Sequence, residues 1–398
     1  MLTLCSLAVA GAKALCTLSV PSSAARRARL QAAAVALFAL STLGLAGGGP
    51  AQAAPATVVD AVGRSVTIEA PAPRIVLMFN YEEATAVAGP AGWDRIVGIS
   101  KGLWAGWRPA IWQRYVAVVP RIAEAVDVGN TEDGDFSVEK TIALKPSVIV
   151  MPEWAYASLK TAREQLEAAG IPIVVIDYNA QTVERHAAST RALGVVFGAQ
   201  GRAEELASLY EKEMADIRRR VASATGAKAK VYVELGQAGP ETVGNSYTTT
   251  MWGKILDTLG AENIAIGRVP GPWGPVNPEY VLAANPDLIF IAGSSWLNRP
   301  KAVKTGYGTE PETTRQSLAP YAARAGWENL KAVKTGEVHA IEHGLARTLF
   351  DFAATQYIAK RLYPAAFADV DPVASLRRYH EAYLPVPFSG TWMLPLKP

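Results

Sequence analysis

The segment from Gln200 to Ala224 constrains the fold of this chain more than any other. Its apolar residues recur at spacings of four, four, three and four positions, which is one face of a helix of about seven turns. These residues are Leu206, Tyr210, Met214, Ile217 and Val221. No Gly or Pro lies between Ala203 and Ala222, so we expect a stiff helix. It is either a strut between two lobes, which we favour, or an ordinary long surface helix of a single domain.

The first 53 residues have the features of an export signal. Three arginines between positions 26 and 29 precede an apolar run over residues 30–46, and Ala51-Gln52-Ala53 has the small-x-small pattern of a signal-peptidase site. The apolar run is short for a membrane span. We therefore expect residues 1–53 to be cleaved on export and the mature chain to be a free protein of the periplasm.

The composition of the mature chain excludes several classes of function. Both cysteines, Cys5 and Cys16, lie in the leader, so the mature chain has no disulfide, no thiolate metal site and no cysteine nucleophile. The leader also holds four of the 39 Lys and Arg residues and no acid, which leaves 35 basic residues against 36 acidic ones. A nucleic-acid partner would require a basic stripe, and the sequence has none.

After the leader, strand-like runs alternate with helix-like runs, and this alternation predicts mainly parallel sheets covered on both faces. Short continuous apolar runs, such as Arg74–Phe79 and Ile173–Asp177, are typical of strands buried in such sheets. We predict an α/β fold with two Rossmann-like lobes, one long rigid helix joining them, and a ligand cleft between them. The predicted parts are a signal peptide over 1–53, an N-terminal lobe over 57–198, the interlobe helix over 200–224, a C-terminal lobe over 228–364 and a tail over 365–398 that packs on the lobes.

The two predicted lobes resemble each other. Residues 137–149 align with residues 277–289 at a constant offset of 140, with Glu, Ala, Pro and Ile coinciding at four positions. Chance or the general pattern of α/β chains could also produce this match, but we favour two copies of one lobe. The aligned glutamates, Glu139 and Glu279, both fall near the start of a predicted helix.

Several short motifs occur in an order that is more specific than any of them alone. They are the exported leader, Arg74-Ile75-Val76, the segments 138–146, 260–263 and 280–287, and the single long helix between lobes. In these features the chain resembles the periplasmic solute-binding proteins of ABC importers for iron–siderophore complexes and cobalamin. The resemblance covers roughly residues 57–364, and the loop over 294–314 and the tail after Asp371 depart from it.

The resemblance implies a binding protein, with no cofactor of its own, that delivers an iron chelate to an ABC permease and its ATPase subunits. It also implies that Glu139 and Glu279 dock on the two membrane subunits, although the helix dipole alone would favour a Glu in a first turn. We expect a monomer with no nucleic-acid partner. Cobalamin, haem or another chelated metal is the alternative ligand, and an exported metal-dependent hydrolase is the alternative from a different class.

No motif in the sequence supports the hydrolase alternative. The chain lacks a G-x-S-x-G elbow, a Walker loop, a dinucleotide fingerprint and an H-E-x-x-H pair. Of the four histidines, His186 and His380 lie in polar helical runs and are predicted to be solvated. His339 falls within a strand and is predicted to be a structural residue with its hydrogen bonds satisfied.

Candidate ligand-binding residues follow from position, because ligands of α/β sheets bind beyond the carboxyl ends of the strands. Aromatic side chains in such loops can form the walls of a cleft for a large ligand, but they can also close the core, and we expect about half of the ten tryptophans to do so. The predicted residues are Phe79, Asn80, Tyr81, Trp104, Trp107, Trp154, Gln237, Tyr247, Trp252, Trp273, Ser295, Trp296, His343 and Arg347.

His343 is the histidine best placed for function, because it directly follows a predicted strand and precedes a helix. It could hydrogen-bond the ligand or complete the coordination of a chelated metal, or its ring could simply cap a loop. Arg347 lies about one helical turn further on and could pair with an acidic ligand.

Overall fold

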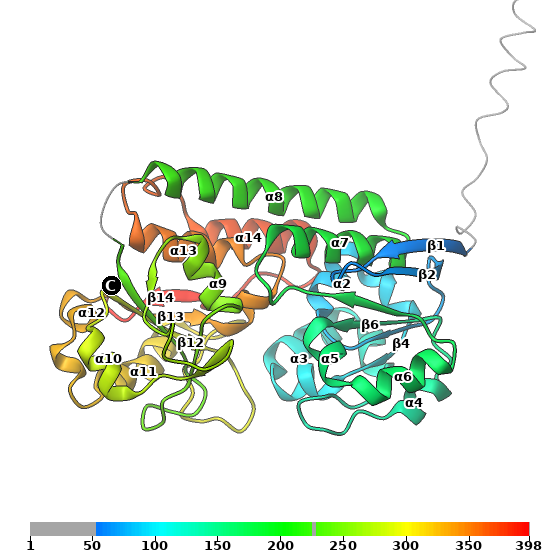
Figure 1. Cartoon of the computed structure of the whole chain (residues 1–398), viewed down its shortest axis with the longest axis horizontal. Coiled ribbons are helices and arrows are strands. Elements are labelled where there is room, and N and C mark those ends of the chain that lie inside the picture. Colours follow the sequence, from blue (N-terminus) through cyan, green and yellow to red (C-terminus); the bar gives the residue numbers. More distant parts are fainter. Residues whose placement is uncertain (1–52, 225–227, 398) are drawn as a thin grey trace, which may run out of the picture. The chain divides into compact units, whose positions relative to one another are not determined.

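The computed structural model describes residues 53–224 and 228–397, and the predicted α/β fold class is confirmed in it. Two five-stranded sheets, ordered β5-β4-β3-β6-β7 and β10-β8-β12-β13-β14, are separated along the chain by α8 (Gln200–Ser223). Figure 1 shows α8 as the longest helix of the fold. The predicted signal peptide, apart from residue 53, lies outside the described residues.

The strands of the two sheets are short, and every pair is parallel except β13–β14. The first sheet contains β3 (Ile75–Leu77), β4 (Ile96–Ile99), β5 (Val126–Asp127), β6 (Val148–Pro152) and β7 (Ile173–Ile176). The second contains β8 (Lys230–Leu235), β10 (Glu262–Asn263), β12 (Leu288–Gly293), β13 (Val338–Glu342) and β14 (Met393–Pro395). Two antiparallel pairs stand apart from them: β1 (Ala54–Val59) with β2 (Ser65–Ala70), and β9 (Asn245–Tyr247) with β11 (Trp273–Pro275).

Helices connect the parallel strands, as crossover connections require. In the N-terminal part they are α2 (Tyr81–Ala88), α3 (Pro109–Val118), α4 (Val138–Ala143), α5 (Glu153–Ser158), α6 (Lys160–Ala168) and α7 (Val183–Phe197). In the C-terminal part they are α9 (Met251–Thr258), α10 (Pro278–Ala284), α11 (Pro311–Ala322), α12 (Lys331–Thr335), α13 (Phe352–Leu362) and α14 (Pro372–Tyr383).

The segments that align at an offset of 140 occupy the same place in the two sheets. Helix α4 leads into β6, which lies beside β3, and helix α10 leads into β12, which lies beside β8. After these helices, Lys145 and Asn285 both adopt the left-handed conformation with φ of 49°. Asn accepts this conformation more readily than Lys does, so the shared backbone, not the residue type, sets the turn.

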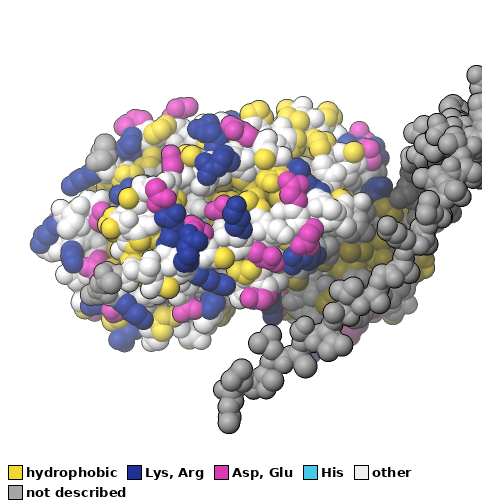
Figure 2. Space-filling view, turned by 90° about the horizontal axis from the view of Figure 1, so that it is seen from above, with side chains coloured by type: hydrophobic (Ala, Val, Ile, Leu, Met, Phe, Trp, Pro, Cys, Tyr) yellow, Lys and Arg dark blue, Asp and Glu magenta, His cyan; other side chains and the backbone are white. Residues whose placement is uncertain are grey.

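Helix α8 packs its predicted apolar face into the core. Leu206, Tyr210, Met214 and Ile217 are buried, and Val221 is partly buried. The Tyr210 ring stacks on His186 of α7 at a centroid distance of 4.8 Å. Seen from the α8 side, charged side chains of both signs are interspersed over the surface (Figure 2), and several are ion pairs.

The prediction that His186 and His380 are solvated was wrong, because both are fully buried. The His186 ring lies 2.9 Å from a carboxylate oxygen of Asp351, at the start of α13. His380 Nδ1 donates to the Leu376 carbonyl at 2.9 Å, and aromatic rings surround it. The polar sequences around these histidines, in α7 and α14, suggest exposed helix faces. In the structure, other helices and the tail cover the faces that carry the two histidines. His339 is buried between Tyr357 and Glu337, which confirms its structural role.

The C-terminal tail adds both a helix and a strand to the fold. Strand β14 pairs antiparallel with β13, so the second sheet extends into the segment after residue 364. The tail also holds the loop that precedes α11: the Gly306 N–H donates to the Thr391 carbonyl at 2.6 Å, and the Thr391 hydroxyl donates to the Thr309 carbonyl at 2.8 Å.

Truncating a buried side chain of α8 tests this packing. Ile217→Ala should lower the free energy of unfolding by about 2–5 kcal/mol, because it leaves a cavity in the core. Lys212→Ala on the exposed face is the control and should change it by less than about 0.5 kcal/mol. Urea denaturation followed by circular dichroism measures both, and equal midpoints for the two variants would contradict the burial of this face.

Candidate functional site

The strand order of each sheet identifies where a ligand can bind. In the first sheet the chain passes from β3 to β4 on one side and later to β6 on the other, so a crevice opens beyond the carboxyl ends of β3 and β6. The second sheet repeats this arrangement with β10 and β12 on either side of β8. Phe79 and Trp154 follow β3 and β6, and Trp296 follows β12.

A small cavity lies at these strand ends and is lined from both lobes. Its volume is about 20 Å³, which is room for about one water molecule. The side chains at these strand ends therefore leave little free space in this cavity. The lining residues are Phe79, Asn80, Tyr81, Glu82, Glu83, Leu103, Trp104, Arg108, Arg347 and Thr348.

Three polar side chains of the N-terminal lobe hydrogen-bond the backbone of residues 346–349, which lie beyond the end of β13. This segment begins in the last residues of a 3₁₀ turn over His343–Arg347, where backbone groups lack partners within the turn and can bond across the interface. The bonds are Asn80 Nδ2 to the Arg347 carbonyl at 3.1 Å, Gln181 Nε2 to the Ala346 carbonyl at 2.7 Å, and the Leu349 N–H to Glu83 Oε1 at 3.1 Å.

Arg108 connects acidic groups of both lobes. Its Nη1 donates to Glu82 Oε2 at 2.9 Å, and its Nη2 lies 3.7 Å from Glu342 Oε1. The side chains of Glu82 and Glu342 are 4% and 1% exposed, so the charges are desolvated and depend on one another. A Cβ at Gly344 would lie 2.6 Å from Arg108 Nη2, which explains why glycine occupies that position.

Burial and mutual charge shift the pKa values of this cluster. Burial raises the pKa of Glu82, although Arg108 opposes the shift. Burial and the neighbouring Glu82 raise the pKa of Glu83 to about 7. Burial lowers the pKa of Arg108, but the carboxylates of Glu342 and Glu82 outweigh it and hold the pKa above its ordinary value.

His343 faces hydrogen-bond donors on both ring nitrogens. Arg347 Nη2 lies 2.6 Å from its Nε2, and Trp252 Nε1 lies 3.2 Å from its Nδ1. A neutral imidazole accepts at only one nitrogen, so the two hydrogen bonds cannot both form. Burial, with the charges of Arg347 and Arg108, holds the pKa of His343 well below its ordinary value, so the ring is neutral.

Arg347 has no carboxylate partner among residues 53–224 and 228–397, and its Nε has no hydrogen-bond acceptor there. Its guanidinium lies 5.9 Å from the centre of the Phe79 ring. Burial, followed by Arg108, lowers its pKa from the ordinary value. Arg347 is partly buried, and a partly desolvated cation without an acid is unfavourable, so this position favours an anion supplied from outside the chain.

Aromatic rings from both lobes surround this position. Tyr247, Trp252 and Trp296 lie 5.8, 6.5 and 6.1 Å from the His343 ring. On the opposite lobe, Phe79 lies 5.7 Å from Trp154. The structure thus brings predicted residues of both lobes together around His343 and Arg347.

Other predicted site residues lie elsewhere or serve the core. Tyr81 and Trp104 stack at 4.5 Å in the core and also line the cavity. Trp107 packs partly buried against the same core. Trp273 is 54% exposed and stands opposite Tyr247 in the β9–β11 ladder. Gln237 and Ser295 are partly exposed.

The charged residues of the site were not predicted from the sequence. Glu82, Glu83 and Arg108 line the cavity, and Glu342 pairs with Arg108, yet none was singled out. Glu82 and Glu83 begin α2 directly after β3, and Glu342 ends β13, so the positional rule that selected Tyr81 and His343 also covers them. Arg108 had no comparable signal.

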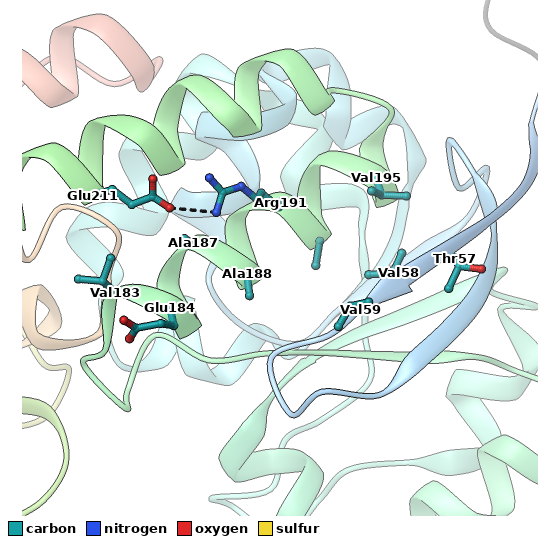
Figure 3. Close-up of a pocket in the computed structure, with 11 residues that line it drawn as sticks. Thr57, Val58, Val59, Val183, Glu184, Ala187, Ala188, Arg191, Val195 and Glu211 are labelled. Carbon is teal, nitrogen blue, oxygen red and sulfur yellow. Dashed lines mark hydrogen bonds and ion pairs between the residues drawn. The ribbon is translucent and has the colours of Figure 1, made fainter.

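A larger cavity is a groove on a different surface (Figure 3). Its volume is about 560 Å³, and small aliphatic side chains of β1 and α7 form most of its wall, with Glu211 of α8 beside them. Arg191 and Glu211 pair across it at 3.0 Å. It contains no predicted site residue and lies away from the carboxyl ends of the strands, so the cavity between the lobes is the better candidate.

The two glutamates predicted to dock lie at equivalent surface positions. Glu139 and Glu279 are exposed in the first turns of α4 and α10, whose N-caps are Ser137 and Asn277. Within the described part of the chain, neither makes an ion pair.

Two kinds of feature are absent from residues 53–224 and 228–397. No helix there is both long and apolar enough to span a membrane. No group of three His, Cys, Asp or Glu side chains there is arranged to hold a metal ion.

The chain is similar in sequence and in fold to several known proteins. A family described as "Periplasmic binding protein" matches residues 71–343. The solved structure of the TroA-like periplasmic binding protein FepB from Veillonella parvula is 34% identical, with a TM-score of 0.80, over 86% of this chain and 99% of that one. The vitamin B12-binding protein of Pectobacterium carotovorum is 32% identical over 158 residues, 40% of this chain and 54% of that protein. The molybdate-binding protein MolA of Haemophilus influenzae is 24% identical over 82% of this chain and 90% of that protein.

The raised pKa of Glu83 predicts a pH-dependent stability. The unfolded chain releases this proton near its ordinary pKa of 4.5, whereas the folded protein holds it until about pH 7. Stability from this group is therefore complete below about pH 4.5 and falls by roughly 3 kcal/mol as the pH rises to about 7. Glu83→Gln should flatten this slope in urea titrations across that range. A slope equal to that of the wild type would contradict the assignment.

Proposed function

We propose, from the premise that the chain belongs to the periplasmic binding protein family, that it binds an iron chelate of the siderophore type between its lobes. The protein is the substrate-binding component of an ABC transporter, which works with a permease and ATPase subunits. The proteins it is similar to are binding proteins, not enzymes. The proposed location is the periplasm, after removal of residues 1–53.

The single observation that carries the ligand class is the position of Arg347. Its guanidinium faces the cavity without a carboxylate partner in the described chain, and the ring of Phe79 lies beside it. Catecholate, hydroxamate and carboxylate groups of iron chelates present oxygen atoms that an arginine binds well. Their flat rings and stems pack on aromatic walls such as Trp154 and Trp296.

Such a ligand needs more room than this cavity offers. Sites for molecules of this size usually occupy about 300–1,000 Å³, whereas the cavity holds about 20 Å³. The chelate would therefore exchange its own contacts for those that Asn80, Glu83 and Gln181 make with the opposite lobe. Each exchanged hydrogen bond is worth only about 0.5–1.5 kcal/mol, so the exchange is feasible.

His343 has a defined role in this proposal. An anionic chelate that captures Arg347 would draw the guanidinium away from the His343 Nε2 and leave the Trp252 contact at Nδ1. With Trp252 donating to Nδ1, the neutral ring carries its proton on Nε2, so this N–H would donate a hydrogen bond to an oxygen of the chelate. To complete the coordination of the metal instead, the ring would have to give up the Trp252 bond and hold its proton on Nδ1. The chelate would bring the other ligands.

A second candidate is a small tetrahedral oxyanion. The small cavity, with Arg108 and Arg347 on its wall, favours it, and MolA is a molybdate-binding relative. Cobalamin and haem remain alternatives by the same mechanism, and the vitamin B12-binding relatives match less than half of this chain. A titration panel separates these classes.

Tryptophan fluorescence titration of the purified protein tests the proposal. Ferric tris-catecholate, ferrichrome and ferric citrate are the chelate probes, and cyanocobalamin, haemin and molybdate are the alternatives. We expect saturable one-to-one quenching by a ferric chelate. Arg347→Met should weaken it about 10–100-fold, because a buried charged hydrogen bond is worth about 1.5–3 kcal/mol. His343→Ala should also weaken it, by about 1–3 kcal/mol, if the ring makes a buried hydrogen bond to the chelate.

Arg218→Met, on the exposed face of α8, is the matched control and should bind like the wild type. Saturable quenching by molybdate but by no ferric chelate would replace the first candidate with the second. Unchanged chelate affinity in Arg347→Met, with an unchanged melting temperature, would remove Arg347 from the site.

We also propose that Glu139 and Glu279 dock on the permease, one glutamate per lobe. Support comes from their exposure, their equivalent positions and the absence of an ion-pair partner in the described residues. The helix dipole alone would stabilise such glutamates by roughly 0.3–1 kcal/mol, so the two roles have to be separated by experiment.

Charge reversal separates them. Glu139→Arg combined with Glu279→Arg should abolish stimulation of the importer's ATPase activity, because the new arginines would repel the basic permease residues with which docking glutamates would pair. Fluorescence titration with the ferric chelate should stay normal. Glu164→Arg with Glu381→Arg is the control of equal charge change on other exposed helices. ATPase stimulation at the wild-type level in the first variant would rule out the docking role.

A further inference from the structure

Each lobe places an exposed aliphatic side chain beside its docking glutamate. Ile142 follows Glu139 by three positions on α4, and Leu282 follows Glu279 by three positions on α10. Residues three apart lie on the same face of a helix. Both aliphatic side chains are 37% exposed, so the two lobes present the same pair of groups to the same extent.

Ile142 and Leu282 are equivalent in the structure as well as in the sequence alignment. Both helices are capped by the side chain of the residue at their N-terminus, and both end before a left-handed residue with φ of 49°. Both lie on the side of the protein remote from α8 (Figure 1). The local backbone thus fixes the same orientation for Ile142 and Leu282.

Single exposed apolar residues are common on protein surfaces. Ile142 and Leu282 are unusual because they occupy equivalent positions in the two lobes. Among the described residues, the large hydrophobic side chains that are exposed are Val59, Val118, Val126, Ile142, Ile266, Trp273, Leu282 and Leu297. Val126 and Ile266 are also 140 positions apart, but Val126 begins a strand and Ile266 lies in a turn after one. Only Ile142 and Leu282 share an element type and a place in it.

The neighbouring charges define the chemistry of a partner. Many acidic residues of the surface are already paired with Arg or Lys, for example Glu204, Asp216 and Glu241. Glu139 and Glu279 have no such partner in the part of the chain that the structure describes. Within the described residues, each lobe therefore presents an unpaired carboxylate next to an exposed aliphatic side chain. A complementary partner surface would have a basic residue beside an apolar depression.

We propose that Ile142 and Leu282 are the apolar half of a duplicated docking contact with the two membrane subunits of the importer. The proposal rests on the docking role proposed for the glutamates and adds the residues that supply desolvated contact area. Two copies of one patch fit a partner that itself presents two related copies of the complementary surface, as a pair of membrane subunits does. The carboxylates orient the encounter, and burial of the aliphatic groups holds the complex.

The test compares apolar and charged variants on the intact protein. The importer is the permease–ATPase complex whose ATPase activity the wild-type protein stimulates, reconstituted in nanodiscs. Biolayer interferometry at low and high salt measures binding of Ile142→Gln with Leu282→Gln and of Glu139→Gln with Glu279→Gln. Gln keeps the helix propensity and approximate length of the side chain. The control, Val59→Gln with Val118→Gln, removes two exposed apolar groups elsewhere.

We expect the apolar variant to bind at least about tenfold more weakly, a loss of about 1.4 kcal/mol, at both salt concentrations. The charged variant should lose affinity mainly at low salt, because salt screens exposed charges. The control should bind like the wild type. All three variants should keep the wild-type melting temperature and the wild-type response to the ferric probe.

The possible outcomes distinguish the role of Ile142 and Leu282 from the docking role of Glu139 and Glu279. Wild-type affinity in the apolar variant, together with weakened binding in the charged variant, would overturn the role of Ile142 and Leu282 and leave the glutamate docking intact. Wild-type affinity in both variants would overturn the docking proposal as a whole. Equal weakening in the Val59 and Val118 control would show that any exposed apolar residue matters and would also overturn the inference.

Discussion

The interface between the lobes depends on the pairing of Arg108 with two carboxylates. Its guanidinium lies between Glu82 of one lobe and Glu342 of the other. Charges buried to this extent are tolerated only when each has a partner, since removal of one leaves another desolvated and unpaired. The cluster therefore fixes which surfaces of the lobes can meet. It also explains the glycine at position 344, where any side chain would collide with the guanidinium.

Around this cluster the interface is made of individually weak contacts. Three hydrogen bonds from side chains of the first lobe reach backbone groups of the second, and the cavity left among them is about the size of a water molecule. Weak polar contacts can be exchanged for equivalent contacts with a ligand at little net cost. Arg347 stands out because its charge has no acid to pair with in the described chain, and its contact with His343 leaves one donor of that ring unsatisfied.

The duplicated architecture links the inner site to the outer surface. The carboxyl ends of the strands face the interface and carry the charged and aromatic residues. The helices that lead into β6 and β12 carry matching glutamate and aliphatic pairs on the outside. Duplication of one lobe together with its surface residues would supply both the strand ends at the interface and the outer glutamate–aliphatic pair. A partner with two related subunits would then recognise both copies of the pair.

Local patterns in the sequence determined the fold class, the long helix and the repeat, because hydrophobic periodicity is a property of neighbouring residues. Position after a strand was also enough to select Phe79, His343 and Arg347. The burial of His186 and His380 and the place of β14 depended on which elements pack against α7, α14 and β13, which no local pattern specifies. Arg108 lies 26 residues from Glu82 and 234 from Glu342 in the sequence, and its role arises only when the lobes bring the three together. Charge pairing in a desolvated interface is a property of distance in space, and only the tertiary structure sets that distance.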